Sequence, residues 1–154
     1  MDFSQLGTLG TTALYAATFT LALVSGIIPF VFNIELYLLA VATLTDAPAA
    51  AIVGLATAGQ TIAKVILYLV GRGALNIKWV KKSASSKAAG AFAKRPNSGL
   101  GVVAFSAAVG FPPLYAVSLV AGTLRLPATA FTVIIVVGRL TRFGCVYLAP
   151  ELFK

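Results

Sequence analysis

Histidine is absent from this chain of 154 residues, and cysteine occurs once, as Cys145 within an apolar run. A single cysteine excludes an intrachain disulfide, and without histidine a zinc or similar metal centre is nearly excluded. Charged residues are also scarce, at 10% of the chain against 59% hydrophobic residues, which is too apolar for an ordinary soluble domain. The composition predicts one integral membrane domain over residues 1–154, with long apolar runs that favour spanning helices over β-barrel strands.

Acidic residues are rarer still, and none occurs between Asp46 and Glu151. Seven basic residues lie in segment 72–98, so the positive-inside rule predicts that this segment is cytoplasmic, in what we take to be a prokaryotic inner membrane. The segment is moderately amphipathic and is expected to lie along the membrane surface, with Trp79 as an anchor. Anionic lipid is its expected partner, and nucleic acid is not. The N-terminus lacks basic residues before its apolar run, so we expect no excised signal peptide.

The first apolar run, residues 9–28, is followed by a short apolar run, residues 36–44, of about half a membrane thickness. Pro29 separates the runs, which predicts the two arms of a re-entrant hairpin. Run 9–28 is also long enough to be a separate spanning helix, and that alternative stays open. Glu35 at the start of the short run is either a helix-terminal residue favoured by the dipole or a functional group that faces the protein interior.

The next helix is predicted over residues 48–70, long enough to span a membrane, with Thr45 or Asp46 as its cap. Three polar side chains recur every four residues on one face of this helix: Gln60, Lys64 and Tyr68. We expect this face to look into the protein. For Lys64 the alternative is that its long side chain snorkels to the cytoplasmic surface.

Two adjacent prolines, Pro112 and Pro113, follow Gly110 and interrupt the apolar segment 100–124. Neither proline can donate a backbone N–H, so the arriving helix must stop there, while Pro113 suits the first position of a new helix. The free N–H groups of that helix start create a partial positive charge that favours an anionic group. Each arm is too short to cross a membrane, so a second re-entrant hairpin is predicted.

The last helix is predicted over residues 127–149, and Arg139 falls near its middle, about half the membrane depth from either end. Snorkelling is difficult from that depth, so Arg139 is expected to have an interior, functional role. Arg142 lies about one turn further on and shares that face, although it is nearer the end of the helix.

The two halves of the chain resemble each other when Pro48 is aligned with Pro127. Three further pairs then match: Gly59 with Gly138, Gln60 with Arg139, and Tyr68 with Tyr147. The repeat predicts an all-α membrane fold of two inverted units, 9–71 and 99–149, each a re-entrant hairpin plus a spanning helix, joined by the basic segment 72–98. In such folds the binding site lies where broken helices meet. The candidate substrate-binding residues are Glu35, Gln60, Lys64, Gly110, Pro112, Pro113, Arg139 and Arg142.

Several short motifs occur in a recognisable order. They are Glu35 after the first break, Tyr68-Leu69-Val70-Gly71-Arg72, Ala121-Gly122, Phe131, and Gly138-Arg139 with Arg142. With these motifs the chain resembles the DedA or VTT-domain membrane proteins, also called SNARE-associated Golgi proteins, over about residues 20–150. The resemblance implies re-entrant hairpins packed against spanning helices, and transport of lipids such as undecaprenyl phosphate or phospholipids. This chain departs from the family by lacking two arginines around the second break; its arginines lie on the last helix, as in smaller, divergent members.

We therefore expect a flippase or scramblase that moves an anionic lipid, such as a polyprenyl phosphate or a phospholipid, between leaflets. Arg139 and Arg142 would neutralise the head group, and Glu35 would pair with an arginine in the empty site or carry a proton. No cofactor is expected, while coupling to protons or sodium is open, as is a homodimer. The alternatives are a proton-coupled exporter of a cationic solute and a non-transporting scaffold that works through residues 74–94. No catalytic arrangement is recognisable, so an enzyme is not expected.

Overall fold

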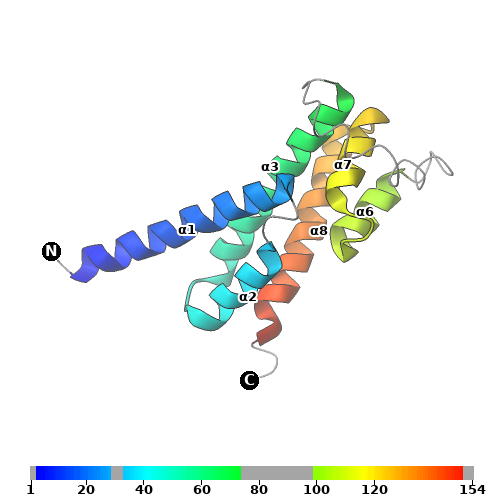
Figure 1. Cartoon of the computed structure of the whole chain (residues 1–154). Helices are drawn as coiled ribbons and strands as arrows, with labels where there is room; N and C mark the ends of the chain where they lie inside the picture. The colour runs from blue at the N-terminus through cyan, green and yellow to red at the C-terminus, as the bar shows by residue number, and fades with distance from the viewer. Residues whose placement is uncertain (1–2, 29–32, 74–98, 151–154) are drawn as a thin grey trace.

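The computed structural model describes residues 3–28, 33–73 and 99–150, and the regular structure of these residues is helical (Figure 1). The helices in chain order are α1 (Phe3–Ile27), α2 (Ile34–Leu44), α3 (Ala49–Arg72), α6 (Gly99–Val109), α7 (Leu114–Thr123) and α8 (Ala128–Leu148). The basic segment predicted to lie on the membrane surface, residues 72–98 with Trp79, falls largely outside the described residues.

Three stretches of the described helices are long and apolar enough to cross a membrane, by length and composition: Gly10–Ile27 in α1, Ala49–Arg72 and Ala128–Leu148. Helices α2, α6 and α7 have 11, 11 and 10 residues and are too short to cross a hydrocarbon layer of about 30 Å. These lengths confirm the predicted all-helical class and support a membrane protein. Helix α1 runs unbroken for 25 residues, so it is long enough for the spanning alternative that the sequence leaves open.

Prolines rather than polar capping residues precede three of the helices. The N-cap residues of α3, α7 and α8, none of which makes a side-chain cap hydrogen bond, are Pro48, Pro113 and Pro127. The expectation that Thr45 or Asp46 caps α3 is therefore wrong. Thr45 instead ends α2, and its hydroxyl donates to the carbonyl of Val41 at 2.8 Å. The Thr45 hydroxyl therefore bonds to the end of α2 and does not cap the start of α3.

Helices α3 and α8 pack against each other at the centre of the fold (Figure 1). Helices α1 and α7 pack on α3, whereas α2 and α6 pack on α8. Each central helix therefore carries one arm from each half of the chain. One core cluster surrounds Tyr68 and Phe131, whose rings stack with their centroids 4.9 Å apart. A second cluster, which includes the fully buried Leu38 and Phe143, joins α1, α2, α3 and α8.

Two tyrosines, one near the end of each central helix, make equivalent hydrogen bonds to the residues that precede the other central helix. The hydroxyl of Tyr68, near the end of α3, donates to the carbonyl of Leu126 at 2.5 Å, just before α8 begins. The hydroxyl of Tyr147, near the end of α8, donates to the carbonyl of Ala47 at 2.8 Å, just before α3 begins. The two donors, Tyr68 and Tyr147, are 79 positions apart in the sequence, and the two acceptors, Ala47 and Leu126, are also 79 positions apart. Both donors and both acceptors therefore occupy equivalent positions in the two halves of the chain. The end of each central helix is thus held to the start of the other.

We expect Tyr68→Phe and Tyr147→Phe each to lower the free energy of unfolding by about 1 kcal/mol or more, because each removes the hydrogen bond to the start of the other central helix. Tyr68→Phe also removes the hydrogen bond that Arg72 Nη1 donates to the Tyr68 hydroxyl at 3.1 Å. Thermal unfolding in detergent, followed by circular dichroism, measures the change. Tyr15→Phe on α1 is the matched control, because the half-buried Tyr15 makes no hydrogen bond within the described residues. Melting temperatures equal to that of the parent in both test variants would contradict the two contacts.

Candidate functional site

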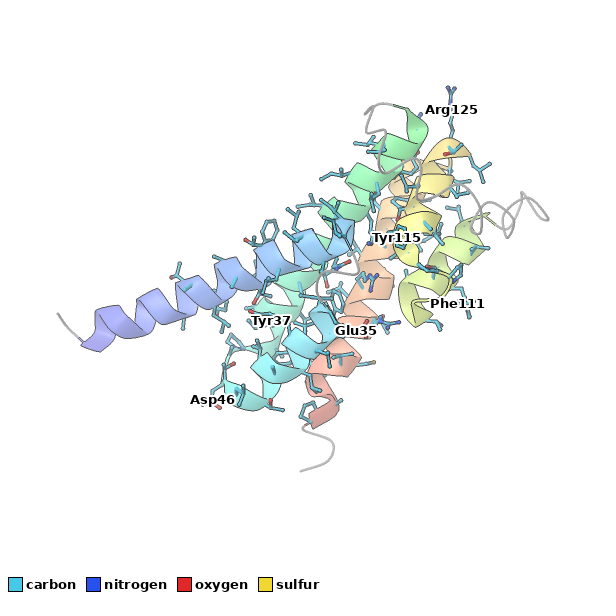
Figure 2. The ribbon with its side chains drawn as sticks, in the orientation of Figure 1. Glu35, Tyr37, Asp46, Phe111, Tyr115 and Arg125 are labelled. Atoms are coloured by element: carbon cyan, nitrogen blue, oxygen red, sulfur yellow. The ribbon has the colours of Figure 1, made fainter. Side chains whose placement is uncertain are left out.

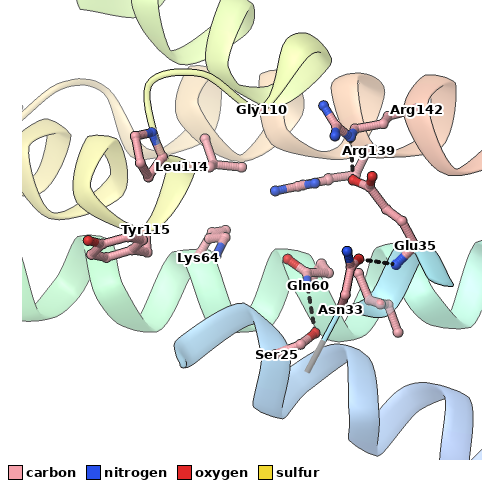
Figure 3. A pocket seen from close by; sticks show the side chains of 12 residues that line it. Ser25, Asn33, Glu35, Gln60, Lys64, Gly110, Leu114, Tyr115, Arg139 and Arg142 are labelled. Carbon is pink, nitrogen blue, oxygen red and sulfur yellow. Dashed lines mark hydrogen bonds and ion pairs between the residues drawn. The ribbon is translucent and has the colours of Figure 1, made fainter. Parts of the chain in front are cut away.

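A cavity of about 300 Å³, called the pocket below, lies between the break that joins α6 to α7 and residues of α1, α2, α3 and α8 (Figure 3). The residues that line it are Ser25, Asn33, Ile34, Glu35, Gln60, Lys64, Gly110, Pro113, Leu114, Tyr115, Arg139 and Arg142. The structure therefore brings together seven of the eight residues predicted to bind substrate. The exception is Pro112, whose carbonyl accepts a hydrogen bond from the Ser106 hydroxyl at 2.5 Å.

The inner side of the pocket carries two buried cations, Lys64 from α3 and Arg139 from α8 (Figure 3). Lys64 is 3% exposed and its Nζ donates to the carbonyl of Gly26 at 2.5 Å. The alternative in which Lys64 snorkels to the surface is therefore wrong. Arg139 is 8% exposed, and its guanidinium lies over the ring of Phe143, 5.4 Å from the ring centroid. The prediction that both side chains face the interior is confirmed.

An ion pair lies at the more accessible side of the pocket. Arg142 Nε donates to Glu35 Oε1 at 2.5 Å, and the two side chains are 24% and 30% exposed. Arg142 Nη1 also donates to the carbonyl of Ala108 at 3.2 Å, so this arginine joins α8 both to α2 and to the last turn of α6. Glu35 lies in the first turn of α2, where the Asn33 side chain accepts from the Glu35 backbone N–H at 3.0 Å. Glu35 is thus both a helix-terminal residue and a residue of the pocket.

The break between α6 and α7 needs the glycine that the sequence provides. Gly110 has a φ of +87°, a left-handed conformation that other residues rarely adopt. A Cβ at this position would also lie 2.6 Å from Arg142 Nη1. Helix α7 starts directly after the break, and Leu114 and Tyr115 of its first turn line the pocket. The positive end of the α7 dipole therefore faces the pocket.

Five pocket residues were not predicted from the sequence: the apolar Ile34 and Leu114 and the polar Ser25, Asn33 and Tyr115. Asn33 had a usable signal, because asparagine is a preferred N-cap residue and stands directly before the short apolar run. Ser25 had none beyond its polarity, although its hydroxyl accepts from Gln60 Nε2 at 2.9 Å. Tyr115 stands at the start of a half-helix, as Tyr37 does in the first unit, but the sequence gives no indication that it reaches the pocket.

Positive charge prevails among the residues that line the pocket. Three cationic side chains against the single carboxylate of Glu35 leave a formal surplus of two positive charges. Buried charge without a counter-ion is costly at membrane depth, so the arrangement suits an anionic ligand. The described residues contain no group of acidic, histidine or cysteine side chains that would hold a metal ion. No protein-family model, curated protein or solved structure matches this chain.

Proposed function

We propose that this chain is a transporter that moves an anionic, phosphate-bearing lipid between the leaflets of a membrane, as a flippase or scramblase. The observation that carries the proposal is the surplus of two positive charges in a pocket lined by residues of apolar helices. A phosphate monoester carries about 1.5 to 2 negative charges near neutral pH and would offset most of that surplus, whereas a phosphodiester, like the monohydrogen form of the monoester, carries one and would offset half of it. A polyprenyl phosphate and a phospholipid are the two candidate substrates.

The proposed architecture is an inverted repeat in the manner of the DedA proteins, with α1–α2 and α6–α7 as re-entrant hairpins that both contribute residues to the pocket. The reciprocal contacts of Tyr68 and Tyr147 support it, because equivalent residues of two inverted units exchange equivalent contacts. Helix α1 is about 37 Å long at 1.5 Å per residue over its 25 residues, so it must lie strongly tilted if its end is at mid-depth. Segment 72–98 would lie on the cytoplasmic side of a prokaryotic inner membrane.

In the proposed cycle the lipid phosphate enters between Lys64, Arg139 and the first turn of α7. Charge-assisted hydrogen bonds from the two buried cations would hold it. Arg142 is the switching residue, because its Nε can donate either to Glu35 or to a phosphate oxygen. A phosphate oxygen that accepts the hydrogen bond from Arg142 breaks the ion pair with Glu35. The Glu35 carboxylate would then be free to carry a proton. The ion pair in the empty pocket is thus a competitor of the substrate.

Proteoliposomes with a labelled lipid phosphate test this function. The expected result is movement between leaflets well above that in protein-free vesicles, measured with and without a pH gradient. If Glu35 carries the proton, Glu35→Gln will still bind the lipid phosphate, but its transport will no longer respond to the gradient. Lipid movement by the parent no faster than in protein-free vesicles would refute transport and leave the scaffold role as the better account.

A further inference from the structure

Two buried polar atoms of the pocket residues, Gln60 Oε1 and Arg139 Nε, have no hydrogen-bond partner among the described residues. The amide oxygen only accepts hydrogen bonds, and the guanidinium N–H only donates them. Both side chains are more than nine-tenths buried, with 3% and 8% exposed. Unpaired polar atoms are costly in an apolar surrounding, so a bound group that pairs with both atoms would be favoured.

Ser25 determines which end of the Gln60 amide faces the pocket. The Ser25 hydroxyl has one hydrogen, which it donates to the carbonyl of Ala22 at 3.2 Å. Toward Gln60 the hydroxyl can therefore only accept, so the amide nitrogen Nε2 must be the atom that lies 2.9 Å from Ser25 Oγ (Figure 3). The amide oxygen is left as a neutral acceptor in a pocket whose charged groups are mostly cationic donors.

We propose that Gln60, oriented by Ser25, makes the pocket select an anion that still carries a hydrogen over an anion of the same shape that carries none. A monohydrogen phosphate group fits, because its unprotonated oxygens accept from Arg139 and Lys64 while its P–O–H donates to Gln60 Oε1. A sulfate ester has acceptor oxygens only, so one of them would face the amide oxygen without a hydrogen between them. This inference rests on the proposed function and narrows its substrate class.

The expected discrimination follows from the cost of an unpaired buried acceptor. A sulfate ester should bind at least about tenfold more weakly than the phosphate ester of the same chain. Inorganic phosphate offers the same hydrogen and the same oxygens as a lipid head group. The shared chemistry is thus a protonated phosphate, and the experiment must separate its two sources.

Binding of tritiated hexadecyl phosphate to the protein in phosphatidylcholine nanodiscs tests the inference, at about pH 6, where roughly half of a phosphate monoester keeps one proton. Unlabelled hexadecyl phosphate, hexadecyl sulfate and inorganic phosphate serve as competitors. We expect the sulfate to compete at least about tenfold more weakly than the phosphate ester. Inorganic phosphate that competes as well as the ester would support selection of a protonated phosphate and contradict a lipid substrate.

Two variants separate selection from folding. Gln60→Met removes the acceptor at similar length, and Ser25→Ala frees the amide to present its nitrogen; in each the preference for phosphate should fall to within about twofold. Thr132→Val is the matched control, because its exposed hydroxyl bonds only to its own helix, and it should keep the full preference. The ratio of the two affinities is the readout, since a merely structural role would weaken both ligands alike.

The possible outcomes distinguish failure of this inference from failure of the proposed function on which it rests. If the parent binds neither ester, the proposed function fails and the inference fails with it. If the parent binds phosphate and sulfate esters equally, an anionic lipid remains the substrate class and the inference is overturned, with Gln60 Oε1 and Arg139 Nε then paired by water. A preference that survives in Gln60→Met also overturns it.

Discussion

Arg139→Met will slow the movement of lipid phosphate by roughly tenfold to a hundredfold, which is the loss expected for one charge-assisted hydrogen bond to a buried anion. The same change will not lower the melting temperature. Arg139 is a buried cation whose Nε has no partner among the described residues, and methionine fills a similar volume without a charge. Replacing a buried charge with a well-packed apolar side chain is often neutral or stabilising. Loss of transport without loss of stability marks a residue kept for function.

Arg125→Met is the matched control for this prediction. Arg125 is exposed in the connection between α7 and α8, away from the pocket, as Figure 2 shows. The control variant should transport at the parental rate and melt at the parental temperature. Proteoliposome transport and thermal unfolding, measured on the same preparations, check both variants. A marked drop in the melting temperature of Arg139→Met with transport intact would show that Arg139 is a structural residue.

The helix pattern was predictable from the sequence because proline and polarity act locally. Breaks followed from Pro29, from Pro112 with Pro113, and from short apolar runs, since proline cannot donate the backbone N–H that a helix interior needs. The buried face of α3 followed from the four-residue spacing of Gln60 and Lys64, because a helix places such residues on one side. These inferences need only one segment at a time.

Partner choice was not predictable in the same way. The sequence indicated that Glu35 would pair with an arginine, but only the packing of α2 on α8 selects Arg142 and leaves Arg139 for the inner side of the pocket. Ser25 could not be found, because its role depends on how closely α1 approaches Gln60. The error at Thr45 has the same origin: a short connection offers its hydroxyl to two helices, and the sequence does not say which helix receives it.

The proposed internal repeat rests on residues that match when the two halves of the sequence are aligned, but the sequence did not show what two of these residues bind. Tyr68 and Tyr147 were aligned without any indication of what their hydroxyls bind. Only when α3 and α8 lie side by side does each hydroxyl reach the connection that precedes the other helix. A contact between units depends on their relative placement, which a comparison of their sequences does not contain.

Gly122→Ala will destabilise the protein by about 3 kcal/mol or more, the scale of a steric conflict that side-chain rotation cannot relieve. Helices α3 and α7 cross where Gly71 and Gly122 meet. A Cβ at Gly122 would overlap the carbonyl oxygen of Tyr68 and lie 2.8 Å from the backbone nitrogen of Arg72. A Cβ at Gly71 would overlap the carbonyl of Leu119 in the same way. Because the obstacles are backbone atoms, the two helices must move apart.

Gly54→Ala is the matched control, because Gly54 lies in the same helix as Gly71 and no atom lies within 4 Å of its absent Cβ. This control should be stabilised by about 0.5 to 1 kcal/mol through helix propensity alone. Thermal unfolding in detergent measures both changes, and an unaltered melting temperature in Gly122→Ala would contradict the close crossing. Displacing α7 also moves Pro113 and Leu114, which line the pocket. Gly122→Ala should therefore lose stability and transport together, whereas Arg139→Met should lose transport alone.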